Sequence, residues 1–192
     1  MGGRKQYNTI YADPPWGYRS GFTGRERKGG ADRNYRTMSI EDIKAMPVGL
    51  LTCAEAVLFL WVTVPMLPYG LTVLDAWGFR YVTMLTWRKL GRLGMGFWFR
   101  VDCEHLMVGV KGNVKAFNVQ RSNFYECRSG RHSEKPDYFR RLVSEAAAMA
   151  FVDPVKLELF ARTKTDLFPG YGMEGWDVFG DEADGTIELP PG

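Results

Sequence analysis

The feature that most constrains the fold is a short apolar segment that ends in two consecutive prolines. Residues 7–12 have the composition of a β-strand, and Asp13, Pro14 and Pro15 follow directly. Neither proline can donate a hydrogen bond to a neighbouring strand, and each restricts the conformation of the residue before it. The strand must therefore end here, and it delivers the carboxylate of Asp13 into a rigid loop beside Trp16.

The rest of the chain alternates between strand-like and helix-like segments. Apolar runs of strand length predict strands at 56–63, 79–87, 105–110, 155–161 and 176–179. Helical spacing predicts three helices: one capped by Ser39, one opened by Pro65 that buries Leu67, Leu71, Leu74 and Trp77, and one opened by Pro136 that buries Phe139, Leu142, Val143, Ala146, Ala147 and Ala150. This alternation predicts a three-layer α/β fold with a mostly parallel sheet, in which ligands bind at the carboxyl ends of the strands.

The length of the chain favours one domain. With 192 residues, of which 45% are hydrophobic, it can bury one sizeable core. We therefore expect a single domain over residues 1–192. Mobile loops are expected at about 17–36, 88–102 and 128–135, where neither helical nor strand periodicity is sustained.

Charge is unevenly distributed along the sequence. Residues 17–36 carry six basic and two acidic side chains, residues 111–135 repeat that balance, and residues 166–192 carry seven acidic and no basic ones. The pattern predicts two basic loops that face a polyanion and an acidic tail that turns away from it, although solvated surface charge would give the same counts.

Several classes of protein are disfavoured. No apolar run approaches the ~20 residues that span a bilayer, and the start of the chain is polar and basic, so we expect a soluble cytoplasmic protein that does not bind membranes. The cysteines, Cys53, Cys103 and Cys127, form no C-x-x-C pair. We therefore expect neither a disulfide framework nor a metal site.

The Asp-Pro-Pro-Trp sequence suits chemistry on an exocyclic amino group. The lone pair of such a group is delocalised into its ring, so it is a poor nucleophile. A carboxylate that accepts one N–H and a fixed carbonyl that accepts the other would favour a pyramidal nitrogen. Asp13 and the carbonyl of Pro14 suit those two roles, Pro15 keeps the loop rigid, and Trp16 offers a face on which an unstacked base can lie.

Further sequence blocks follow this tetrapeptide, at 35–39, 58–63, 77–79, 87–89, 104–113, 135–136 and 158–162. In the content and order of these blocks the chain, from about Tyr11 to Gly185, resembles the MT-A70 family of adenine-N6 methyltransferases and looks like a compact bacterial or phage member. The resemblance implies a Rossmann-like, S-adenosylmethionine-dependent methyltransferase fold in permuted (class β) order, in which the catalytic loop precedes the cofactor-binding strand.

The resemblance also implies roles for single residues. Lys135 matches a lysine beside the methionine carboxylate of S-adenosylmethionine, Phe160 and Arg162 match the end of the cofactor strand, and Lys164 stands at a family histidine. Asp181 and Glu182 stand where the family contacts the ribose hydroxyls, and Asp13 borders the same site. The substrate side is expected to include Trp16, Tyr35, Arg36, Trp87 and Lys89.

The resemblance leaves the substrate and the assembly open. We expect DNA, with RNA as the alternative, and target choice by residues 17–36 and 88–102. Two further alternatives are a non-catalytic nucleic-acid-binding subunit of such an enzyme and methylation of cytosine N4. A homodimer or a partner subunit is also possible, and Phe97 or Trp98 could serve such an interface.

Overall fold

A computed structural model of the chain describes residues 5–17, 37–91, 93–94, 98–117, 121–128, 135–161, 175–180 and 187–190. Its centre is a seven-stranded sheet in the order β5-β3-β4-β2-β1-β6-β7. The strands are β1 (Tyr7–Ala12), β2 (Thr52–Thr63), β3 (Arg80–Leu90), β4 (Cys103–Lys111), β5 (Phe124–Arg128), β6 (Lys156–Leu159) and β7 (Trp176–Phe179).

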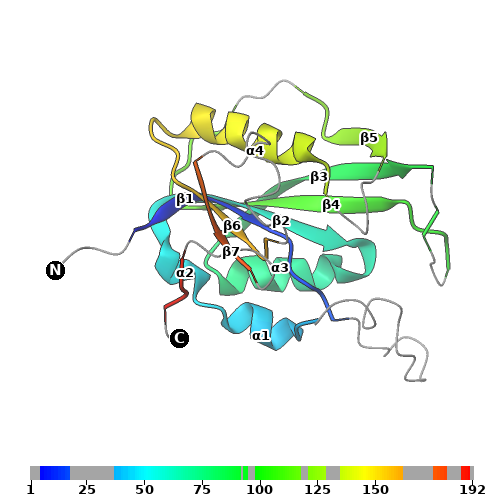
Figure 1. Cartoon of the computed structure of the whole chain (residues 1–192), viewed down its shortest axis with the longest axis horizontal. Coiled ribbons are helices and arrows are strands. Elements are labelled where there is room, and N and C mark those ends of the chain that lie inside the picture. The colour runs from blue at the N-terminus through cyan, green and yellow to red at the C-terminus, as the bar shows by residue number, and fades with distance from the viewer. Residues whose placement is uncertain are drawn as a thin grey trace.

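Helices cover both faces of this sheet, which gives three layers (Figure 1). One face carries α4 (Asp137–Ala150), and the other carries α1 (Ile40–Ala45), α2 (Val48–Leu51), the 3-10 turn η1 (Val64–Met66) and α3 (Leu67–Ala76). Two hydrophobic clusters fill the spaces between the layers. The cluster beneath α4 is rich in aromatic side chains and includes Tyr11, Phe59, Trp61, Trp87 and Phe139.

Strand directions decide which side chains meet at the edge of the sheet. β1, β2, β6 and β7 run parallel as neighbours, and β3 runs parallel to β5. β4 lies between β2 and β3 and is antiparallel to both. The first residues of β4 therefore lie at the edge where β1, β2 and β3 end.

The predicted three-layer α/β fold with a mostly parallel sheet is confirmed. The Ser39 side chain accepts a hydrogen bond from the Asp42 N–H, as predicted for the cap of α1. Apart from β5, each described strand agrees with a predicted one within a few residues, and the largest difference is that β2 begins four residues earlier. α4 buries its predicted face apart from Ala150, which is half-buried.

Two expectations about local structure are wrong. Leu71 is 46% exposed, because α3 buries Gly70, Val73 and Leu74, so its buried face is rotated by about one residue from the predicted one. β5 falls within residues 111–135, where no strand is predicted. Its side chains alternate between exposed and half-buried, so it lacks the apolar run that identifies a buried strand.

The sheet edge at β5 and β3 is partly open in the described part of the chain. β5 pairs with Thr86–Leu90, whereas Tyr81 and Val82, earlier in β3, are each more than 40% exposed.

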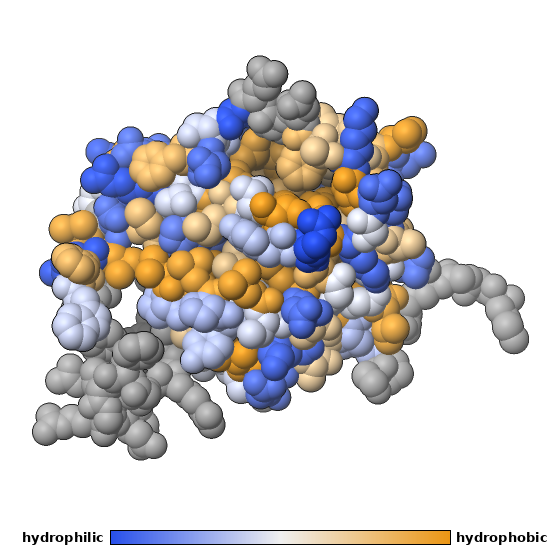
Figure 2. All heavy atoms as spheres, turned by 180° about the vertical axis from the view of Figure 1, so that it is seen from behind, coloured by the Kyte–Doolittle hydropathy of each residue, from blue (hydrophilic) through white to orange (hydrophobic). Residues whose placement is uncertain are grey.

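Seen from behind, the molecule has a band of hydrophobic residues across its surface (Figure 2). Among the helices that the structure describes, none is long and apolar enough to span a membrane.

Candidate active site

The loop after β1 is fixed by backbone hydrogen bonds on both sides of Trp16. The Trp16 N–H donates to the Pro14 carbonyl at 2.9 Å, the Met38 N–H donates to Pro15 at 2.9 Å, and the Gly17 N–H donates to Met38 at 3.0 Å. A Cβ on residue 17 would lie 2.8 Å from the Met38 oxygen, so glycine is required there. These bonds fix the loop that follows Asp13, and the Asp13 N–H itself donates to the Leu159 carbonyl at the end of β6 at 3.4 Å.

A chain of alternating charges begins at this carboxylate. Lys135, just before α4, places its Nζ 2.7 Å from Oδ2 of Asp13 and 3.3 Å from Oε2 of Glu104. The other oxygen of Glu104 pairs with Lys89 at the end of β3. We call these four residues, Asp13, Lys135, Glu104 and Lys89, the charge network.

The topology of the sheet explains why the charge network forms. Asp13, Glu104 and Lys89 each lie two residues from a member of the core cluster beneath α4, namely Tyr11, Leu106 and Trp87. Side chains two apart in a strand share a face, so all three charged groups point towards the layer that contains α4. Because β4 is antiparallel, Glu104 lies opposite Thr63 of β2 and Trp87 of β3.

The charge network is partly buried, and each charge in it stabilises the ionised form of its neighbours. Burial alone lowers the pKa of Lys135, but the carboxylates of Asp13 and Glu104 outweigh it and leave that pKa above its usual value. Burial alone raises the pKa of Glu104, but the charges of Lys135 and Lys89 outweigh it and leave that pKa below its usual value. Both groups are therefore ionised at neutral pH.

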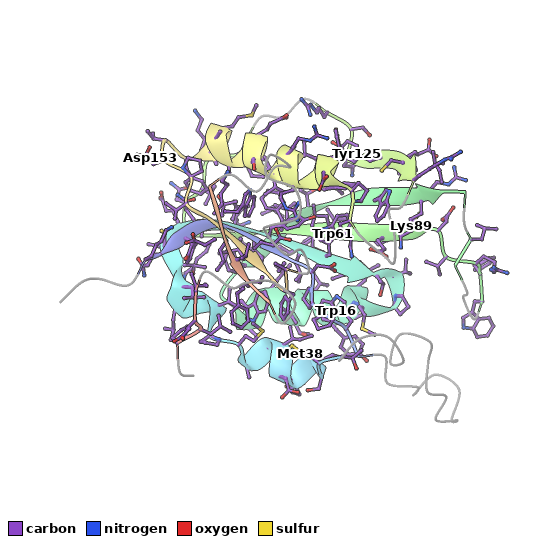
Figure 3. The ribbon with its side chains drawn as sticks, viewed as in Figure 1. Trp16, Met38, Trp61, Lys89, Tyr125 and Asp153 are labelled. Carbon is purple, nitrogen blue, oxygen red and sulfur yellow. The ribbon has the colours of Figure 1, made fainter. Side chains whose placement is uncertain are left out.

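Trp61 links the charge network to the loop after β1. Its carbonyl accepts the Trp16 indole N–H at 2.9 Å, and its own indole N–H donates to the Tyr11 hydroxyl at 2.7 Å. The Lys135 ammonium lies 5.3 Å from the centre of the Trp61 ring, a cation–π distance. The rings of Trp61 and Trp87 are 6.0 Å apart and edge to face. Figure 3 shows Trp16, Trp61 and Lys89 towards the end of the molecule where β2 and β3 finish.

A second group of charges lies under the same helix. Arg140 of α4 donates through Nε and a terminal nitrogen to the two oxygens of Glu158, both at 2.9 Å, and bonds Asp137 at 3.2 Å. Glu158 is in β6 and pairs in register with Tyr11 of β1. Burial, followed by the nearby Glu158 charge, raises the pKa of Tyr11, so its hydroxyl stays protonated. We call Arg140, Glu158 and Asp137 the Arg140 cluster.

The predicted cofactor residues are only partly described. Lys135 lies in the charge network, and Phe160 follows directly after β6, where its φ of 64° places a bulky residue in the left-handed region. Gly180, directly after β7, lies against Ala161, and a Cβ on residue 180 would be 2.2 Å from the Ala161 carbonyl oxygen. Arg162, Lys164, Asp181 and Glu182 lie outside the described residues.

The predicted substrate residues are also divided. Lys89 is in the charge network, 5.2 Å from the centre of the Trp87 ring, whereas Tyr35 and Arg36 lie outside the described residues. Trp87 is 0% and Trp16 is 6% exposed, and both indole N–H groups bond main-chain carbonyls. In this conformation neither ring presents a face to a base, and their contact with substrate stays a prediction.

Two residues of this edge, Glu104 and Trp61, were not singled out by sequence reasoning. Both belong to blocks that carry the family resemblance, at 104–113 and 58–63. Glu104 also stands alone as an acidic residue at the start of an apolar strand, a signal that could have marked it. At this edge the paired cations and carboxylates of the charge network lie next to the rings of Trp61 and Trp87. Such an arrangement is suited to holding a small zwitterion next to a planar ring.

Comparison with known proteins agrees with this geometry. The family model described as MT-A70 matches residues 7–180 of the chain. The chain is 28% identical to the type II methyltransferase M.MunI of a Mycoplasma species, over 97% of this chain and 82% of that protein. It is 27% identical to the human N(6)-adenosine-methyltransferase catalytic subunit METTL3, over 97% of this chain and 30% of that protein. A probable MT-A70-like N(6)-adenosine-methyltransferase of Oryza sativa is 26% identical over 94% of this chain and 24% of its own length.

Proposed function

Because the chain belongs to the MT-A70 family of methyltransferases, we propose that it transfers a methyl group from S-adenosylmethionine to the N6 amino group of adenine in DNA. The observation that carries this proposal is the position of Asp13. Its carboxylate lies at the carboxyl edge of the sheet, in a loop fixed by hydrogen bonds and within 2.7 Å of the Lys135 ammonium.

Asp13 and Pro14 would activate the amino group of the target base. One oxygen of Asp13 accepts one amino hydrogen, and the Pro14 carbonyl accepts the other. That carbonyl already accepts the Trp16 N–H at 2.9 Å, but a carbonyl oxygen has two lone pairs, so one is left for substrate. Held in this way, the nitrogen becomes more pyramidal and its lone pair points out of the ring plane.

The residues at this edge fit the proposed cofactor. S-adenosylmethionine supplies the methyl group on a positively charged sulfonium when it is bound. Lys135 would hold the carboxylate of its amino acid portion, as a flexible point charge can, and Phe160 would border its adenosine. Arg162, Lys164, Asp181 and Glu182 stay proposed contacts to the same molecule.

The proton balance needs no further group. As the new C–N bond forms, the C–S bond breaks and the methylated nitrogen becomes acidic. Its proton leaves to a carboxylate oxygen of Asp13 or to water. Glu104 would keep Lys135 in place during this step, since it contacts the same ammonium at 3.3 Å.

We favour DNA as the polymer that carries the adenine. One relative that this chain covers over most of its length, 82%, is the type II methyltransferase M.MunI. The chain covers 30% of the N(6)-adenosine-methyltransferase catalytic subunit METTL3, and the adenosine in that name, a ribonucleoside, motivates RNA as the alternative.

Methyl transfer to DNA and RNA, measured side by side, tests the proposal. The protein is incubated with S-adenosylmethionine labelled in its methyl group and with each polymer, and the methylated nucleoside is then identified after digestion. We expect N6-methyladenine in DNA, and we expect Asp13→Ala to reduce its formation by about 100-fold or more.

The matched control is Asp153→Ala, since Asp153 lies in the loop between α4 and β6, away from the carboxyl edge of the sheet (Figure 3). This variant should retain wild-type transfer. Methylation confined to RNA would move the substrate to the alternative, and 4-methylcytosine would refute adenine as the acceptor. Full activity of Asp13→Ala would refute the catalytic assignment.

A further inference from the structure

Two of the most exposed aromatic side chains in the described part of the chain are neighbours in sequence. Trp98 is 89% and Phe99 is 87% exposed, between β3 and β4. Exposure of two large aromatic side chains together is unfavourable unless they contact a partner. Their position identifies a surface that the chemistry of Asp13 does not use.

Hydrogen bonds link the described residues that flank these rings in the sequence. β3 and β4 continue to pair beyond their ends, with the Lys89 N–H bonded to the Asp102 carbonyl at 2.7 Å and the Gly94 N–H bonded to Val101 at 2.7 Å. The Arg100 guanidinium donates to the carbonyls of Gly94 at 2.8 Å and Leu93 at 3.0 Å. We call residues 93–94 and 98–101 the hairpin tip. A braced tip of this kind presents its aromatic rings without large loss of conformational entropy on binding.

The hairpin tip extends from the same edge as the charge network. β3 ends just after Lys89 and β4 begins just before Glu104, so the tip continues two strands that hold network residues. Figure 1 shows these two strands reaching beyond the rest of the sheet at this edge. The segment 88–102 carries four basic residues and one acidic residue, and this net positive charge favours an anionic partner, although Arg88 and Lys89 also pair with carboxylates of the chain itself.

We propose that Trp98 and Phe99 form a wedge that enters the base stack of duplex DNA next to the target adenine. This inference rests on the proposed function. Adenine N6 in a duplex is paired and stacked, so the base must leave the helix to reach Asp13. Aromatic side chains that enter the vacated space replace its stacking, and Arg100, beside them, provides positive charge for the phosphates.

Comparison of duplex and single-stranded DNA of the same sequence tests the wedge. The two substrates are a linearised plasmid and the same plasmid after heat denaturation, which together present every sequence context. Trp98→Ala/Phe99→Ala should reduce methyl transfer to the duplex by about tenfold or more, because base–aromatic stacking is lost. Transfer to the denatured strands should change by less than about twofold, since their bases need no extrusion.

Three controls separate the wedge from other roles. Val152→Ala truncates a side chain that is 98% exposed in the loop after α4, and it should leave both rates unchanged. Trp98→Phe/Phe99→Trp keeps two aromatic rings and should retain most of the duplex activity. Thermal unfolding should show the same Tm for every variant, because the exposed rings pack against little of the core.

Each remaining outcome overturns the wedge. Equal losses on both substrates, together with a fall in molar mass by light scattering, would show that the hairpin tip binds a second copy of the chain. No loss on either substrate would show that the rings have no role in duplex recognition. If wild-type protein methylates neither DNA form nor RNA, the proposed function fails and the wedge fails with it, whereas wild-type activity with an unaffected variant refutes the wedge alone.

Discussion

Helix α4 covers both the charge network and the Arg140 cluster, and the two differ in how their charges are paired. In the Arg140 cluster one guanidinium meets both oxygens of Glu158 at 2.9 Å, a planar and directional match. In the charge network Lys135 touches Asp13 and Glu104 as a point charge. The two parallel hydrogen bonds of a guanidinium fix one geometry, whereas an ammonium shared between two carboxylates can turn towards a third carboxylate.

The position of each group matches this difference. Glu158 lies within β6 and its side chain is 9% exposed, so the Arg140 cluster joins α4 to the sheet. Asp13 and Lys135 lie where a strand has ended and a helix has not yet begun, at the edge where α/β folds bind ligands. We infer that the first group stabilises the fold and that the second exchanges partners when a ligand binds.

The largest expected effect is on stability, from Arg140→Met. The substitution leaves the Glu158 carboxylate buried without its cation, which costs about 3–5 kcal/mol. Urea unfolding of the wild type and the variant at pH 7 measures the difference. The double variant Arg140→Met/Glu158→Met removes both charges and should recover most of the loss. A loss below about 1 kcal/mol in the single variant would mean that this pair is no more structural than a surface ion pair.

A smaller effect is expected from Lys135→Met, and it should appear in ligand binding. Removal of the ammonium should raise the Kd for S-adenosylmethionine by about tenfold or more in calorimetry, equivalent to about 1.4 kcal/mol. Stability should fall less than in Arg140→Met, because Glu104 keeps its contact with Lys89. Lys156→Met is the matched control, since its ammonium also lies 5.3 Å from a tryptophan ring, that of Trp176. Equal losses of affinity in both variants would contradict an exchangeable role for Lys135.

The smallest effect is the pH dependence of Glu104→Gln. The pKa of Glu104 is lowered in the folded protein, because Lys135 and Lys89 outweigh burial. Its ionised form therefore stabilises the fold above the usual pKa of 4.5, and this contribution is lost as the pH falls through the lowered value. The variant should be less stable than the wild type by about 0.5–1 kcal/mol at pH 7.

Urea unfolding at several pH values checks this expectation. The difference between the two proteins should shrink as the pH is lowered below 4.5. A difference that grew with acidification would mean that Glu104 is protonated in the native state at neutral pH.

The sequence predicts Asp13 and the order of elements because their signals are local. Two prolines after an apolar run end a strand wherever they occur, and helical spacing marks α4 without knowledge of its partners. Local signals are weaker for α3, where Gly70 and Val73 rather than Leu71 face the core. The phase of a short amphipathic helix depends on the sheet that it covers.

The charge network depends on topology, which no short segment encodes. Glu104 meets Lys135 and Lys89 because β4 runs antiparallel between β2 and β3. The four residues lie near the ends of β1 and β3 and near the starts of β4 and α4. They come together only after the sheet is assembled. Trp61 likewise reads as a core residue of β2 until its carbonyl and ring are seen to hold Trp16 and Lys135.

The hydrogen bonds that pin Gly17 and Met38 together have a consequence for evolution and engineering. They link Gly17 to Met38, which lie on either side of residues 18–36 in the sequence, and so fix the backbone of the loop that begins at Asp13. Doubling the length of a flexible insert adds only about 0.6 kcal/mol to the cost of closure. A segment of another length could therefore be inserted between Gly17 and Met38 with the hydrogen bonds next to Asp13 kept, but the predicted substrate residues Tyr35 and Arg36 would be exchanged with it.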